Sequence, residues 1–96
     1  MKVEQITKNK ILLITTKGCD GCTIAKRNIF QALSNTSKKI NLEIRDCEEL
    51  TKTYIRKLGI KDFPAIILLK DDEIKVKYVG SVPTIVILRW IDVHFK

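Results

Sequence analysis

The chain has 96 residues, of which 45% are hydrophobic; 18 Lys and Arg residues against 11 Asp and Glu residues give a formal net charge of +7. This length suits a single domain, residues 1–96, with one modest hydrophobic core. No apolar run approaches the ~20 residues of a membrane-spanning helix, and residues 1–10 lack the apolar segment of a secretory signal. These features exclude a transmembrane helix and favour the cytoplasm as the compartment.

The positive charge is spread along the chain instead of being gathered in one tract, and aromatic residues make up only 6%. Proteins that bind nucleic acid typically cluster their basic residues or interleave them with aromatic residues. We therefore interpret the charge as a solvated surface and expect no nucleic acid among the partners.

The first two predicted elements are a strand and a helix. Residues 11–14 are four consecutive apolar residues, which is typical of a strand buried on both faces, so we expect a strand over residues 10–15. A helix should follow from Asp20 to about Leu33. The residues expected on its buried face are Cys22, Ala25, Ile29 and Leu33.

Cys19 and Cys22 fall at the junction between this strand and this helix. On the first turn of a helix the two residues share a face, with Cα atoms about 5 Å apart, inside the span of about 4.4–6.8 Å that a disulfide closes. Free backbone N–H groups and the helix dipole favour a thiolate at Cys19. The pair is therefore predicted to be a reversible dithiol/disulfide switch.

The middle of the chain continues the alternation of strands and helices. Apolar residues alternate with polar ones over residues 40–46, which predicts a second strand. Residues 48–58 are expected to form a helix with Leu50, Tyr54 and Leu58 on one face and Gly59 as its C-terminal cap. A third, fully buried strand is predicted over residues 65–69 and a fourth over residues 74–78.

A final helix is predicted over residues 82–95, capped by Ser81 and with Pro83 in its first turn. Its buried face would consist of Ile85, Leu88, Ile91 and Phe95. Residues 85–88 are apolar all round and mostly β-branched, so a strand is the alternative there. The surplus apolar surface leaves two readings open, core burial or contact with a partner.

The order β-α-β-α-β-β-α resembles that of the short, glutaredoxin-sized proteins of the thioredoxin-fold family, from about Ile11 to the C-terminus. The segments that carry the resemblance are Cys19-Asp20-Gly21-Cys22, Asp46-Cys47-Glu48, the run from Tyr54 to Pro64, and Tyr78-Val79-Gly80. The resemblance implies an α/β fold with a four-stranded mixed sheet flanked by helices. It also implies a thiol-disulfide oxidoreductase.

The resemblance assigns roles to individual residues. Cys19 would be the attacking thiolate and Cys22 the thiol that resolves the mixed disulfide, with Lys17 adding positive potential. Pro64 would be cis and lie against the CxxC motif, while Phe63 presents backbone groups to the substrate. Gly18, which stands where thioredoxins carry a tryptophan, would belong to the same substrate-binding surface.

The chain also departs from the family pattern. Leu13 occupies the position of the buried aspartate of thioredoxins, and Gly21 that of the proline inside the motif. Only Gly80-Ser81 remains of the glutaredoxin segment that binds glutathione, so no glutathione site and no cofactor beyond the disulfide are expected. The implied partners are protein disulfides and an electron donor similar to thioredoxin reductase, and the implied state is a monomer.

Two other function classes remain open. The loop over residues 16–22 resembles that of a CxxC metal carrier, but Lys17 and the extra helix over residues 48–58 argue against it, and no metal site is expected. A non-catalytic binding module of the same fold is the other alternative. Cys47 is interpreted as a structural residue in acidic surroundings, with a regulatory or intermolecular disulfide as the alternative.

Overall fold

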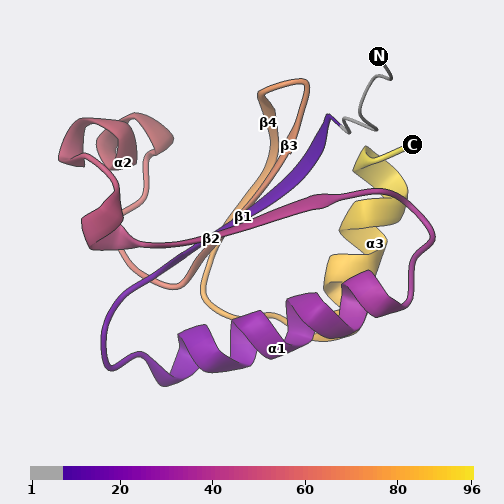
Figure 1. The fold of residues 1–96 in the computed structure, drawn as a ribbon, viewed down its shortest axis with the longest axis horizontal. Helices are drawn as coiled ribbons and strands as arrows, with labels where there is room; N and C mark the ends of the chain where they lie inside the picture. The colour runs from indigo at the N-terminus through magenta and orange to yellow at the C-terminus, as the bar shows by residue number, and fades with distance from the viewer. Residues whose placement is uncertain (1–7) are drawn as a thin grey trace, which may run out of the picture.

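The computed structural model describes residues 8–96 (Figure 1), so the expectation for the first seven residues lies outside the described part of the chain. The elements follow the predicted order, with one short 3-10 turn added. They are β1 (Asn9–Thr15), α1 (Asp20–Ser34), β2 (Asn41–Asp46), the 3-10 turn η1 (Cys47–Glu49), α2 (Lys52–Leu58), β3 (Ala65–Lys70), β4 (Glu73–Val79) and α3 (Thr84–His94).

The four strands form one mixed sheet in the order β2-β1-β3-β4. β1 pairs in parallel with β2 and antiparallel with β3, and β3 pairs antiparallel with β4. The two central strands are the apolar ones: residues 11–14 of β1 and residues 65–68 of β3 are at most 2% exposed. Continuous apolar runs are typical of strands covered on both faces, and both predictions are confirmed.

Helices cover both faces of the sheet (Figure 1). α1 and α3 lie on one face, where Ala25 and Ile29 of α1 pack in one cluster with Ile87 and Ile91 of α3. α2 lies on the other face, and its Leu58 belongs to a second, smaller cluster. The predicted fold class, α/β with a four-stranded mixed sheet flanked by helices, is confirmed.

The buried face of α1 differs from the prediction at one position. Cys22, Ala25 and Ile29 are buried as expected, but Ala32 completes the face and Leu33 is only partly buried. Ala32 and Leu33 follow Ile29 by three and four residues, and both spacings fit one helix face. The approach of α3 to this end of α1 selects Ala32 as the buried residue.

The predicted helix over residues 48–58 is divided in two. Asp46 caps the turn η1, because its carboxylate accepts from Glu48 N at 2.9 Å and its own N–H donates to Glu49 Oε1 at 2.9 Å. Leu50 is extended, and α2 starts afresh at the Thr51 cap. Within α2, Ile55 and Leu58 pack toward the core. Tyr54, predicted on the buried face, is 39% exposed.

The final helix is a helix and not a strand, but it begins two residues later than predicted. Pro83 is the N-cap residue and offers no side-chain cap, so the Ser81 cap and the placement of Pro83 inside the first turn are wrong. The carbonyl of Val82 instead accepts from Asn28 Nδ2 of α1 at 2.9 Å. This bond holds the approach to α3 against α1.

The buried face of α3 agrees with the prediction at Ile91 and Phe95, but Ile87 takes the place of Ile85 and Leu88 is only partly buried. Ile87, Ile91 and Phe95 are at most 1% exposed, whereas Ile85 is 69% exposed. The helix start at Thr84 and the contact with α1 orient α3 in this way. Within residues 8–96, none of the helices combines the length and apolar character needed to cross a bilayer.

Candidate active site

The candidate site lies where β1 ends and α1 begins. The chain turns between them at Gly18, whose φ of +65° lies in the left-handed region that glycine adopts without steric cost. Cys19 is the N-cap residue of α1, and its Sγ accepts a hydrogen bond from Cys22 N at 3.0 Å. The first sulfur therefore takes the place of the serine or aspartate oxygen that usually caps a helix.

Cys19 and Cys22 are joined by a disulfide, with their Cα atoms 5.2 Å apart. Cys22 is buried, with 6% of its surface exposed, while Cys19 at the helix tip is only partly buried. Of the two sulfurs, Cys19 is thus the one that a large partner reaches first. The N–H groups of the first helical turn face this sulfur and favour its anionic form.

Pro64 lies directly against the motif although it is 45 residues away from Cys19 in sequence. The Phe63–Pro64 peptide bond is cis, as the resemblance implied. A Cβ atom placed on Gly21 would come within 3.3 Å of Pro64 Cδ. The Pro64 carbonyl accepts from Gly80 N at 2.7 Å, which joins the entrance of β3 to the end of β4 beside the disulfide.

Phe63 has its side chain packed against the smaller core cluster, which contains Leu58 and Ile60. Its backbone N–H donates to the Asp62 carboxylate, Oδ1, at 2.8 Å. The resemblance assigns the backbone of Phe63 to pairing with the substrate, and in this structure the Phe63 N–H is already bonded to Asp62.

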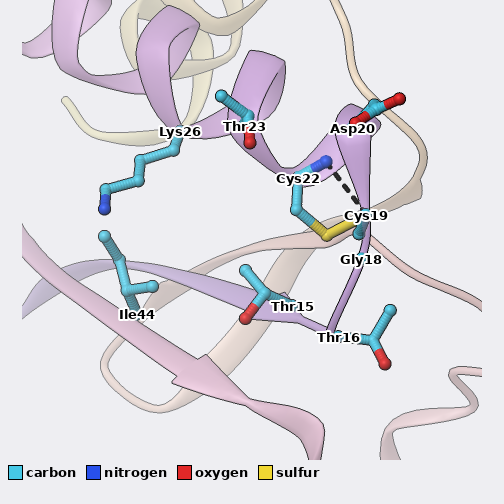
Figure 2. A pocket seen from close by; sticks show the side chains of 9 residues that line it. All are labelled: Thr15, Thr16, Gly18, Cys19, Asp20, Cys22, Thr23, Lys26 and Ile44. Carbon is cyan, nitrogen blue, oxygen red and sulfur yellow. Dashed lines mark hydrogen bonds between the residues drawn. A yellow bond between two sulfur atoms is a disulfide. The ribbon is translucent and has the colours of Figure 1, made fainter.

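An open cavity of about 430 Å³ adjoins the disulfide on the side of β2 (Figure 2). Three threonines, one aspartate and one lysine are its polar lining residues. The residues that line it are Thr15, Thr16, Gly18, Cys19, Asp20, Cys22, Thr23, Lys26 and Ile44.

Comparison with known proteins gives the fold a name. No protein-family model and no curated protein sequence matches the chain. A solved structure of thioredoxin-2 from the malaria parasite, a component of its protein secretion machinery, superposes with a TM-score of 0.80 at 24% identity, covering 97% of this chain and 89% of that one. Another structure, of a malarial protein, gives 0.78 at 24% identity, covering 93% and 99%. The chain has a thioredoxin-like fold.

Within this thioredoxin-like fold the CxxC pair lies at the start of α1. Lys17, a predicted site residue, lies beside Glu48. Its ammonium lies 3.9 Å from Glu48 Oε1, and both side chains are largely exposed. Its predicted influence on the thiolate stays a prediction.

Cys47 is the remaining cysteine, unpaired and half-buried. Its Sγ lies 3.7 Å from Thr16 Oγ1, so it contacts the loop that leads to the motif from the end of β2. Among residues 8–96, no group of three or more His, Cys, Asp or Glu side chains is placed to hold a metal ion.

Three features of the site were missed from the sequence. The resemblance placed Pro64 against the motif, but not Gly21 as the residue that it touches, and it gave no sign that Asp62 accepts the Phe63 N–H. Lys26 on the cavity wall could have been found, because it follows Cys22 by four residues and so lies on the same side of α1.

Proposed function

We propose that this protein is a thiol-disulfide oxidoreductase that reduces protein disulfides through Cys19 and Cys22. The observation that carries the proposal is the disulfide at the tip of α1 with the Pro64 ring packed on Gly21 between the two cysteines. This arrangement leaves Cys19 accessible and keeps Cys22 one turn inside the helix. The asymmetry suits two successive sulfur exchanges.

In the first exchange, the Cys19 thiolate attacks one sulfur of the substrate disulfide. A mixed disulfide forms, and the second substrate sulfur leaves as a thiolate that takes up a proton. In the second exchange, Cys22 loses its proton and attacks Cys19 Sγ. The Cys19–Cys22 bond forms, the first substrate sulfur leaves, and two electrons have passed from the dithiol to the substrate.

The substrate would be held by backbone pairing at Phe63, next to Pro64. Such pairing needs no particular substrate side chain and suits a broad range of protein disulfides. We further propose that the redox group is the disulfide alone, with no glutathione site, and that an enzyme similar to thioredoxin reductase returns the electrons. The proposed setting is the cytoplasm, where reductases keep dithiols reduced, and the proposed state is a monomer without nucleic-acid partners.

The test is reduction of insulin by the protein in the presence of dithiothreitol, or of NADPH with a thioredoxin reductase. The wild type should accelerate the reaction, and Cys19→Ser should abolish the acceleration. Iodoacetamide should modify Cys19 before Cys22 near neutral pH. Absence of dithiol-dependent reduction with either donor would favour the binding module, and metal retained by the reduced protein would favour the metal carrier.

Pro64→Ala provides the first specific prediction. Removing the ring opens the contact with Gly21 and the edge on which the substrate pairs, while Cys19 keeps its position at the helix tip. Insulin reduction should slow by about tenfold or more, and alkylation of Cys19 by less than about twofold. Equal slowing of both reactions would show that Pro64 acts on the thiol and not on the substrate.

A further inference from the structure

The second exchange of the proposed function raises a question about Cys22. This thiol is only 6% exposed, and it must lose a proton before it attacks Cys19. Burial disfavours a thiolate. The part of β1 that runs beneath it, residues 11–14, is fully apolar, so it supplies neither a proton acceptor nor a compensating charge.

The cavity beside the disulfide offers both. Its volume of about 430 Å³ is large enough for several water molecules, and three threonines are among the residues that line it. Thr15 Oγ1 donates to Arg45 O at 3.4 Å and Thr16 Oγ1 accepts from Cys47 Sγ at 3.7 Å, so each of these hydroxyls keeps only part of its hydrogen-bonding capacity for such waters, and Thr23 offers the third hydroxyl. In Figure 2 the Lys26 side chain extends from α1 toward Ile44, so its ammonium is drawn at the wall opposite the disulfide, and Cys22 lines the same cavity.

Two charged side chains line this cavity, and their effects on a thiolate are opposite. Asp20 sits on the first turn of α1 and is drawn in Figure 2 pointing away from the Cys22 sulfur. Lys26 follows Cys22 by four residues, and side chains with that spacing on a helix are neighbours, with Cβ atoms about 5–6 Å apart.

The other charges of this region are already paired. Lys17 lies beside Glu48, and the Asp46 carboxylate, at the β2 end that pairs with Thr15, accepts from the Glu48 amide. The Cys47 thiol contacts Thr16. Among the described residues that line the cavity, Lys26 is the cation.

We propose that Lys26 is a positioning residue for the resolving step: its charge stabilises the Cys22 thiolate across the cavity, where threonine-bound water accepts the thiol proton. The proton passes from Cys22 Sγ to this water and on to solvent. The thiolate then closes the disulfide with Cys19 while the substrate sulfur leaves. This inference rests on the proposed function for its biological meaning, but the step itself can be followed with a small aromatic disulfide.

The experiment uses Cys47→Ser protein, reduced and mixed in a stopped-flow instrument with 5,5′-dithiobis(2-nitrobenzoate). Attack by Cys19 releases the first thionitrobenzoate, and attack by Cys22 on the resulting mixed disulfide releases the second. Lys26→Gln should slow the second release about three- to tenfold at pH 7 and move the midpoint of its pH profile upward. The first release should change by less than about twofold.

Arg27→Gln is the matched control, because it removes one positive charge from the next residue of α1, outside the cavity lining. It should leave both releases within about twofold of the starting protein. Lys26→Arg restores the charge and should restore the second rate. The proposal is overturned if Lys26→Gln and Arg27→Gln give the same second rate and the same pH midpoint, with both variants folded by circular dichroism.

A failure of the proposed oxidoreductase function gives a different result from a failure of the proposal for Lys26. In that case the protein does not reduce insulin with any supplied donor, whereas the two thionitrobenzoate releases and their dependence on Lys26 are still measured.

Discussion

Gly18 and Gly21 lie on either side of Cys19, and each is suited to its position for a different reason. Gly18 has a φ of +65° and open space where a Cβ atom would stand, so its requirement is the backbone conformation. Gly21 lies in α1, and its requirement is the Pro64 ring at 3.3 Å from a Cβ placed there. An added methyl group would push Pro64 away from the disulfide. Gly18 thus allows the turn that leads to Cys19, and Gly21 allows Pro64 to lie close to the disulfide.

Asp62 supplies a prediction at the same scale. Its carboxylate accepts the Phe63 N–H, the group proposed to pair with a substrate backbone. Asp62→Ala removes this competitor, so KM for insulin should fall by about two- to fivefold, which corresponds to a net hydrogen bond of modest strength. Steady-state reduction assays at constant reductase measure the change.

Asp62→Asn is the control for charge, because it removes the negative charge and keeps a side-chain oxygen as acceptor. Its KM should stay close to that of the wild type. If both variants lower KM equally, the charge of Asp62 and not its hydrogen bond governs substrate binding.

At the scale of elements, the connection from β2 to α2 shows two helix starts in close succession. Asp46 caps η1 through Glu48 and Glu49, and Thr51 caps α2 by accepting from Tyr54 N at 3.0 Å. Since each cap satisfies its own free N–H groups, the chain forms two short elements in place of one longer helix. The break moves Tyr54 to the surface and Ile55 to the core.

Thr51→Ala should lower the free energy of unfolding by about 1 kcal/mol, because α2 loses the acceptor for the Tyr54 amide. Thr53→Ala is the matched substitution inside the same helix, where threonine caps nothing and alanine has the higher helix propensity. It should be neutral or slightly stabilising. Urea unfolding followed by circular dichroism compares the two, and equal losses would contradict the capping role.

The β1–β2 pair carries a charge cluster that makes stability depend on pH. The Glu43 carboxylate bonds Lys10 Nζ at 2.8 Å and Arg45 Nε at 2.8 Å, and these bonds, Lys10 first, lower the pKa of Glu43. A group whose folded pKa is lowered stabilises the fold above its unfolded pKa of about 4.3, and the contribution disappears as pH falls through the folded value.

Glu43→Gln should therefore lower the free energy of unfolding by about 0.5 kcal/mol at pH 7, a small value because the cluster lies at the surface and is screened by salt. The difference from the wild type should vanish near pH 3. Glu73→Gln, in the more exposed pair with Lys75, should have a smaller effect at pH 7. A loss at Glu43 that is the same at both pH values would point to packing.

At the scale of the whole molecule, α1 and α3 are held together from end to end although they lie far apart in sequence. Asn28 bonds the carbonyl of Val82, and Thr84 Oγ1 donates to Gln31 Oε1 at 2.9 Å. At the other end, Phe95 is 1% exposed in the cluster of α1, α3 and the sheet. The last helix thus closes the larger core beneath the sheet.

Phe95→Ala should lower the free energy of unfolding by about 3 kcal/mol, since it removes a buried aromatic ring and leaves a cavity. Phe30→Ala is the control, because that ring is 48% exposed on α1 and should contribute less than about 1 kcal/mol. Urea unfolding at two protein concentrations measures both variants. A midpoint that rises with concentration would show that a dimer, and not a monomer, is being unfolded.

The order of elements could be predicted from the sequence because each element carries its own local pattern. Residues 11–14 and residues 65–68 are apolar without interruption, which predicts two buried strands. The CxxC pair follows the first of these strands at the N-terminus of a helix, and this local geometry brings the Cα atoms of Cys19 and Cys22 to 5.2 Å from each other. Pro64 before the third strand is equally visible. These features depend on neighbours within a few residues, where backbone geometry decides.

Which residues of each helix face are buried, and which residues meet at the site, was decided by the tertiary structure alone, because both depend on contacts between distant parts of the chain. Ala32 and not Leu33, and Ile87 and not Ile85, are buried because α1 and α3 pack on each other. The Pro64 ring meets Gly21 only when the segment before β3 folds against the first turn of α1, and Lys26 and Ile44 line one cavity only when α1 lies over β2. Periodicity indicates that a face is apolar, but the helix that covers it selects the residues, since packing is a property of both surfaces.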